Sequence, residues 1–248
     1  MSHIDGLIPQ LLKHGKRTVR ELSASGSINA ETFASLHRKA NSLLSRLTAE
    51  GIQTSTRIGI LGRNSREWIV ADLVLIELQC LSVEIPWELG AAEQQDYISI
   101  CDIHNLTALI VISSHNDSDD AVIEIFKHPK PGRTKKIGPD DLTVTFSRDP
   151  NDPPTAITIS KSDTSNAIES FVNVWAPSSR DHLLVVVPFA SFQQRFLVYL
   201  AIKYGFDITL APHELMHQAL TRFSPTIMSN DRYLWMSLGG RSFPGGAA

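Results

Sequence analysis

Residues 57–68 read RIGILGRNSREW, and this stretch decides the fold. Its first half, residues 57–62, is a short apolar run whose two glycines let the backbone pass close to a neighbour, as in a buried strand. Asn64 and Ser65 follow, and both residue types favour the start of a helix. The apolar stretch from Trp68 to Leu78 continues that helix. The sequence therefore predicts a strand that leads directly into a helix.

The segments on either side of this stretch continue the alternation of helices and strands. Upstream, residues 28–51 carry apolar side chains every three or four residues, the period of an amphipathic helix: Phe33, Leu36, Ala40, Leu43, Leu44 and Leu47. Downstream, we expect a strand over 81–86, a helix over 90–102 and a buried strand over 106–112. This alternation predicts an α/β fold with mainly parallel sheets flanked by helices.

The second half of the chain resumes the same pattern after a polar interruption. Strands are expected over 156–159, 183–187 and 206–210, with helices between them and a final helix over 214–223. Residues 113–153 are rich in Ser, Asp, Lys and Pro, which is typical of a linker or surface excursion. We therefore expect a first α/β lobe over 1–112, a polar linker over 113–153 and a second, truncated lobe over 154–248.

Composition narrows the class of protein. The 248 residues include 23 Lys+Arg and 26 Asp+Glu, a net charge of -3, so nothing favours a nucleic-acid partner. The longest apolar run, residues 183–190, is far shorter than the ~20 residues of a membrane span. The start of the chain lacks the features of a signal peptide. We expect a cytoplasmic protein without a membrane span.

Four stretches together resemble the N-terminal part of the adenylate-forming superfamily, which includes acyl- and aryl-CoA synthetases, nonribosomal-peptide adenylation domains and luciferases. They are residues 32–43 (TFASLHRKANSL), 57–68, 181–191 (DHLLVVVPFAS) and 225–228 (PTIM). The resemblance covers nearly the whole chain. It implies the fold of the N-terminal subdomains of these enzymes, and it implies ATP-dependent activation of a carboxylate.

The resemblance also implies a Thr/Ser/Gly-rich loop, ending in Pro-Lys-Gly, that grips the β- and γ-phosphates of ATP. Glycines let backbone amides approach the phosphates, while hydroxyls and a lysine bind them. We match this loop to residues 160–167, SKSDTSNA, with these candidate phosphate-binding residues: Ser160, Lys161, Ser162, Thr164 and Ser165. The stretch contains no glycine, and Asp163 would repel phosphate by about 1 kcal/mol or more. We expect a degenerate loop.

A second family feature differs near the expected carboxylate site. The family's P-x-x-H segment reads Pro188-Phe189-Ala190-Ser191 here, so serine replaces the histidine. The residues that would line an acyl pocket for an apolar carboxylate or thioester are Trp87, Phe189, Ser191 and Phe192. The alternative is that the two phenylalanines belong to the core.

The family's S-G-G strand corresponds to residues 237–240, close to the last residue. The resemblance places the adenine- and ribose-binding residues and the catalytic lysine beyond it. We therefore expect a truncated homologue that has lost ATP-dependent carboxylate activation and acts as a pseudoenzyme or a binding protein. Truncation would leave apolar surface exposed, so we expect a homodimer or a partner protein to cover it. No cofactor is expected.

Three alternative functions stay open. One is an ATP-independent enzyme that uses the old acyl pocket. Another is half of a split acyl- or aryl-AMP ligase, for which ATP and Mg²⁺ would be cofactors. The third is a zinc hydrolase, because residues 213–217 match H-E-x-x-H, with His213 and His217 as ligands and Glu214 as base. No glutamate follows Glu214 to supply a third ligand, which favours a solvated histidine pair.

Overall fold

The computed structural model describes residues 4–87, 96–113, 121–131, 137–146 and 155–229. The helices are α1 Leu7–Lys13, α2 Phe33–Ala49, α3 Arg66–Glu77, α4 Asp96–His104, α5 Lys161–Trp175, α6 Phe192–Tyr204, the 3₁₀ turn η2 His213–Leu215, and α7 Met216–Phe223. The strands are β1 Thr18–Leu22, β2 Ile28–Thr32, β3 Arg57–Leu61, β4 Leu81–Ile85, β5 Ala108–Ser113, β6 Val122–Lys127, β7 Asp141–Phe146, β8 Ala156–Ser160, β9 His182–Val185, β10 Asp207–Leu210 and β11 Ile227–Met228.

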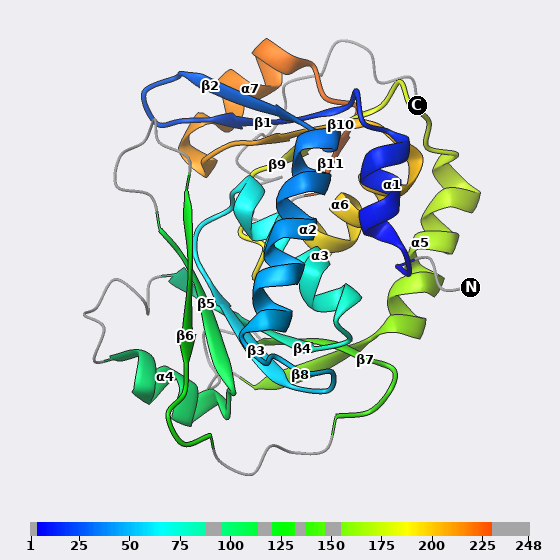
Figure 1. Ribbon diagram of the computed structural model, residues 1–248. Coiled ribbons are helices and arrows are strands. Elements are labelled where there is room, and N and C mark those ends of the chain that lie inside the picture. The colour runs from blue at the N-terminus through cyan, green and yellow to red at the C-terminus, as the bar shows by residue number, and fades with distance from the viewer. Residues whose placement is uncertain (1–3, 88–95, 114–120, 132–136, 147–154, 230–248) are drawn as a thin grey trace.

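The strands form two sheets, with helices between them and around them (Figure 1). The five-stranded sheet has the order β11-β9-β10-β1-β2, and the six-stranded sheet has the order β6-β5-β3-β4-β7-β8. The pairs β1–β2, β5–β6 and β7–β8 are antiparallel, and the other pairs are parallel. This architecture confirms the predicted α/β fold of mainly parallel sheets flanked by helices.

Residues 57–68 fold as predicted, as a strand followed by the start of a helix. β3 ends at Leu61, and Ser65 caps α3 because its side chain accepts a hydrogen bond from the Trp68 amide at 3.1 Å. Gly59 allows the close packing of β3, since a β-carbon there would lie 2.6 Å from the side chains of Leu106 and Leu109. Every residue of α3 from Arg66 to Ile76 is buried, as expected for a helix packed between two sheets.

Residues 28–32 and the polar segment 113–153 differ from the predicted elements. Residues 28–32 form β2 rather than the start of a helix, because Thr32 caps α2 by accepting from the Ser35 amide at 3.2 Å. The polar segment 113–153 contributes β6 and β7 to the six-stranded sheet in its described parts, where Leu142 and Val144 are buried. Their alternating apolar residues fill the sheet despite the polar composition around them.

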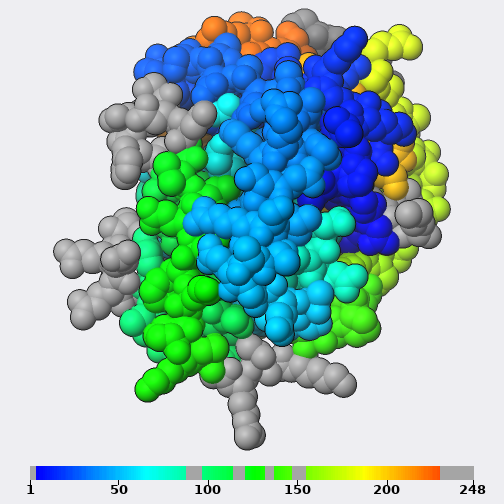
Figure 2. All heavy atoms as spheres, viewed as in Figure 1, coloured from blue at the N-terminus to red at the C-terminus, as the bar shows by residue number. Residues whose placement is uncertain are grey.

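The chain also crosses between the two sheets. β1 and β2, from the expected first lobe, pair with one another and through β1 with β10 from the expected second lobe. On the face shown in Figure 2, α2 runs across the surface between α1 and β6. No helix in the described ranges is both long enough and apolar enough to cross a membrane.

Candidate functional site

The segments that follow β3 and β9, one strand from each sheet, meet at the carboxyl ends of these strands, where α/β proteins bind ligands. Asn64, just after β3, joins the two segments. Its side-chain amide donates to the Val187 carbonyl at 2.8 Å, and its oxygen accepts from the Phe189 amide at 2.8 Å. The junction of the strand ends is therefore the candidate location of a ligand site.

Of the residues proposed for an acyl pocket, Phe189 lies in the core. Phe189 is 2% exposed and stacks on Trp68, with the ring centroids 4.7 Å apart. The space beside these rings holds no room for a water molecule, and it is lined by Trp68, Ile69, Asp72, Phe189, Arg195, Val198 and Tyr199. Phe189 is a core residue, as the alternative interpretation of the sequence proposed.

The other three candidates have separate surroundings. Ser191 is the half-buried residue before α6, and its hydroxyl makes no capping hydrogen bond. Phe192 is half-buried, with the Arg195 guanidinium 5.5 Å from its ring centroid. Trp87 is half-buried just after β4, and the Arg63 guanidinium lies 4.0 Å from the centroid of its ring. The Arg63–Trp87 pair is thus a cation on an aromatic face near the carboxyl ends of β3 and β4.

A buried polar network is centred on Arg195 and lies between α3, β4, β7 and α6. The sequence analysis did not predict it. Arg195 is 0% exposed and forms ion pairs with Asp72 of α3 and Glu84 of β4. Its guanidinium also donates to the Thr143 hydroxyl at 2.7 Å and to the Ser82 hydroxyl at 3.1 Å. The sequence signal that could have predicted this network is the position of Asp72, Glu84 and Arg195 inside apolar stretches. The network ties α3, β4, β7 and α6 together.

Burial sets the protonation of this network. Desolvation raises the pKa of Glu84 to about 7, although Arg195 opposes the shift. Desolvation also raises the pKa of Tyr199 well above its usual range, and the Tyr199 hydroxyl donates to Asp72 at 2.5 Å. For Arg195, burial disfavours the charge, but Asp72, Tyr199 and Glu84 outweigh that effect and raise the pKa. The guanidinium therefore stays charged, while Glu84 titrates near neutral pH.

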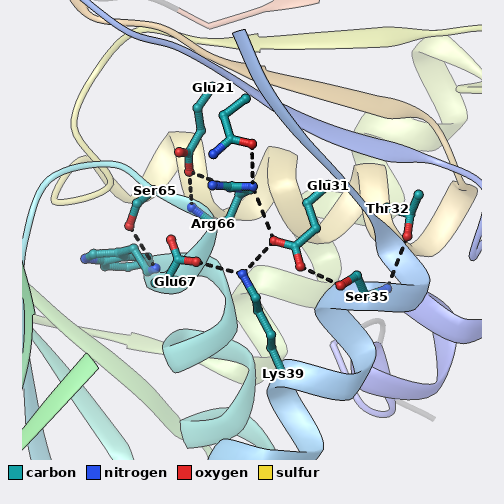
Figure 3. A network of polar contacts seen from close by, with 10 residues as sticks. Glu21, Glu31, Thr32, Ser35, Lys39, Ser65, Arg66 and Glu67 are labelled. Carbon is teal, nitrogen blue, oxygen red and sulfur yellow. Dashed lines mark hydrogen bonds and ion pairs between the residues drawn. The ribbon is translucent and has the colours of Figure 1, made fainter. Parts of the chain in front are cut away.

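A second network joins the two N-terminal strands to α2 and α3 (Figure 3). The Lys39 ammonium donates to Glu31 at 2.7 Å and to Glu67 at 3.0 Å. Arg66 pairs with Glu31 at 3.3 Å and with Glu21 at 3.2 Å. Each of these five side chains meets at least one opposite charge, so the cluster fastens elements to one another. Arg66 and Glu67, which belong to the stretch 57–68, thus have a structural role.

The candidate phosphate-binding residues lie at a strand-to-helix junction rather than in a loop, which corrects the prediction. Ser160 ends β8, and the others belong to the first turns of α5. The Ser160 hydroxyl accepts from the Asp163 amide at 2.9 Å, and the Thr164 hydroxyl donates to the Ser160 carbonyl at 2.7 Å. Ser, Thr and Asp favour helix caps as much as loops, because their side chains bond to nearby backbone groups.

A carboxylate of the chain itself occupies the amino terminus of α5. Asp140 accepts from the Ser162 amide at 3.1 Å and from the Ser162 hydroxyl at 2.5 Å. An open surface hollow of about 510 Å³ adjoins this point, and its lining is Asp5, Pro139, Asp140, Lys161, Ser162, Ser165 and Asn166. The hollow has two carboxylates and one lysine. Its charge therefore favours a cation over a phosphate.

The connection between β7 and β8, residues 147–154, lies outside the described residues. Its sequence, SRDPNDPP, contains neither glycine nor lysine. More widely, no glycine occurs between Gly138 and Gly205. The residue type that lets backbone amides close on phosphates is therefore missing from the loop as well as from the start of α5.

The H-E-x-x-H residues do not form the arrangement of a zinc-binding helix. His213 and Glu214 lie in the 3₁₀ turn η2, whereas His217 lies in α7, and all three are exposed. Within the ranges that the structure describes, no group of three or more His, Cys, Asp or Glu side chains could hold a metal ion.

Two sheets that pack on either side of the buried helix α3 define the fold. Solved structures share this fold. The chain aligns with CmiS6 at 13% identity (TM-score 0.72), covering 96% of this chain and 60% of that one. It aligns with the N-terminal domain of FACL13 from Mycobacterium tuberculosis at 15% identity (TM-score 0.71), covering 98% and 66%. It aligns with o-succinylbenzoate CoA synthetase from Bacillus subtilis at 14% identity (TM-score 0.69), covering 94% of this chain and 63% of that one.

Residues 13–164 match the sequence model of the AMP-binding enzyme family, which is more than half of the chain. The chain belongs to this family. It spans between half and two thirds of the length of the solved structures that it resembles. Comparison with curated proteins gives no match.

Proposed function

We propose that this chain keeps the fold of the AMP-binding family but does not itself activate carboxylates with ATP, and that it acts as a binding protein. One observation carries the proposal: no glycine occurs between Gly138 and Gly205. A phosphate loop needs backbone amides that close around the anion, and glycine is the residue that allows this approach.

The charges at the start of α5 support the same conclusion. Asp140 already accepts from the backbone and hydroxyl of Ser162, where the dipole of a helix would otherwise attract an anion. Asp163 adds a second carboxylate in the first turn. Each carboxylate close to a phosphate would cost about 1 kcal/mol or more. Ser191, in the place of the family's histidine, also lacks a group that can carry a positive charge.

The ligand in this proposal is an apolar carboxylate or thioester, or else a partner protein. The Arg63–Trp87 pair favours a carboxylate with an apolar body, because it offers a guanidinium and a half-buried aromatic face together. It lies near the strand ends where α/β proteins bind ligands. Among the residues that the structure describes, none near this pair is an evident acid, base or nucleophile for an ATP-independent reaction, so we propose binding rather than catalysis.

Calorimetric titration of the full chain with Mg·ATP tests the proposal. We expect no binding heat up to about 1 mM nucleotide, and no exchange of pyrophosphate into ATP with a panel of carboxylates. A family member that forms adenylates is the positive control. Titration of the same preparation with medium-chain carboxylates and their thioesters, compared with Trp87→Ala, checks the ligand class.

Binding of Mg·ATP with a Kd below about 1 mM would overturn the proposal. In that case the split-ligase alternative would become the better one, and the search would turn to a second polypeptide that completes the site. Nucleotide binding that is accompanied by pyrophosphate exchange would instead identify the chain as an active ligase.

A further inference from the structure

The two sheets end in four edge strands, and three of these are short, carry charged residues or are contacted by a helix. β11 has only two residues. β2 carries Glu31, which belongs to the charged network of α2 and α3. β6 is bound by α2, because Arg46 donates to the Ile123 carbonyl at 3.0 Å and Lys127 of β6 donates to the Glu50 carbonyl at 3.1 Å. Charged and covered edges resist pairing with another chain.

The edge formed by β8 differs from the other three. Ala156, Ile157 and Thr158 are exposed, and Ile157 is 44% exposed. The five residues of the strand carry no charge. β8 pairs with β7 on one side, and no strand in the described part of the chain pairs with its other side. A neutral, unpaired edge that presents apolar and β-branched side chains is a template for another strand.

The sequence of β8 suits a second copy of itself. In an antiparallel pair with a two-fold axis at Thr158, the two Thr158 residues face each other. Ile157 then faces Ile159 of the second copy, and Ala156 faces Ser160. These pairs place no like charges together, and β-branched cross-strand pairs are favourable. The pairing is confined to β8, because α5 begins at Lys161.

We infer that two copies of this chain associate through antiparallel pairing of their β8 strands, which joins the two six-stranded sheets into one. The pairing is isologous, as expected for a two-fold homodimer. Five paired residues bury less than the ~800 Å² per partner of a standard interface, so the dimer is concentration-dependent. This inference does not depend on nucleotide binding, and it gives the expected homodimer a specific surface.

Sedimentation equilibrium of the full chain from about 1 to about 200 µM tests the inference. We expect a reversible monomer–dimer equilibrium. Thr158→Lys and Thr158→Glu each place two like charges at the axis, and each should weaken the dimer roughly tenfold at low salt. An equimolar mixture of the two variants should restore association, because opposite charges then face each other. Thr158 is exposed, so both variants should fold, which circular dichroism checks.

Val122→Lys is the matched control, since Val122 is 48% exposed on the edge strand β6 and the change adds the same charge. It should leave the dimer unchanged. The inference is wrong if the unmodified chain is monomeric throughout the range, or if Thr158→Lys dimerises as well as the unmodified chain. It is also wrong if the mixture associates no better than either variant, or if Val122→Lys weakens the dimer equally.

Discussion

A single buried guanidinium, that of Arg195, pairs with two buried carboxylates, those of Asp72 and Glu84. Removing one partner of such a group leaves an uncompensated buried charge, which costs more than the intact pair contributes. Thr143, Ser82 and Tyr199 complete the hydrogen bonding of the network. The network therefore requires α3, β4, β7 and α6 to be packed together.

Glu84 makes the stability of the protein depend on pH. Its pKa rises from 4.5 to about 7 on folding, so the folded state holds the proton more tightly than the unfolded state. The stabilisation from this proton is complete below about pH 4.5 and is lost as the pH rises through about 7. We expect Glu84→Gln to flatten the fall in unfolding free energy between those pH values, measured by urea denaturation. Glu77→Gln, on the exposed end of α3, is the control and should keep the slope of the unmodified protein.

At the scale of single elements, capping residues explain both the successes and the error of the sequence analysis. Ser65 and Thr32 precede apolar periodic stretches, and both cap helices. Ser160 does the same for α5, yet the Ser- and Thr-rich stretch that follows it resembled a phosphate loop. Local composition could not separate these two possibilities, because both use hydroxyls that bond to backbone amides.

The cap of α3 provides a prediction at this scale. Ser65→Ala removes the acceptor for the Trp68 amide, so the free energy of unfolding should fall by about 1 kcal/mol. Ser42→Ala is the control, since Ser42 is exposed within α2 and alanine favours helices. Urea denaturation measures both changes. Equal stability of Ser65→Ala and the unmodified protein would contradict the role of this cap.

At the scale of the whole molecule, one hydrophobic core reaches both sheets. The same cluster of buried residues contains Val19 and Ile208 from the five-stranded sheet and Ile58 and Ile110 from the six-stranded sheet. α3 lies between the sheets and contributes residues from Trp68 to Ile76 to this cluster. A core shared in this way couples the unfolding of the two sheets.

We therefore expect a single cooperative unfolding transition for the described part of the molecule. Tryptophan fluorescence, to which the buried Trp68 between the sheets contributes, and far-ultraviolet circular dichroism should give coincident denaturant midpoints. The comparison is made at a low protein concentration, so that association does not affect the midpoints. Two separate transitions would instead support the independent lobes, 1–112 and 154–248, that the composition predicts.

The sequence by itself determined most helices and strands, the α/β class and the family resemblance, because periodicity, caps and glycines act over a few neighbouring residues. The tertiary structure decided which of those residues meet. Arg195 bonds to Asp72 across 123 residues and to Glu84 across 111, and Phe189 becomes core because Trp68 stacks on it. It also decided that β8 lies at an edge of its sheet. Pairing over such distances depends on how the sheets pack, which no local pattern of residues specifies.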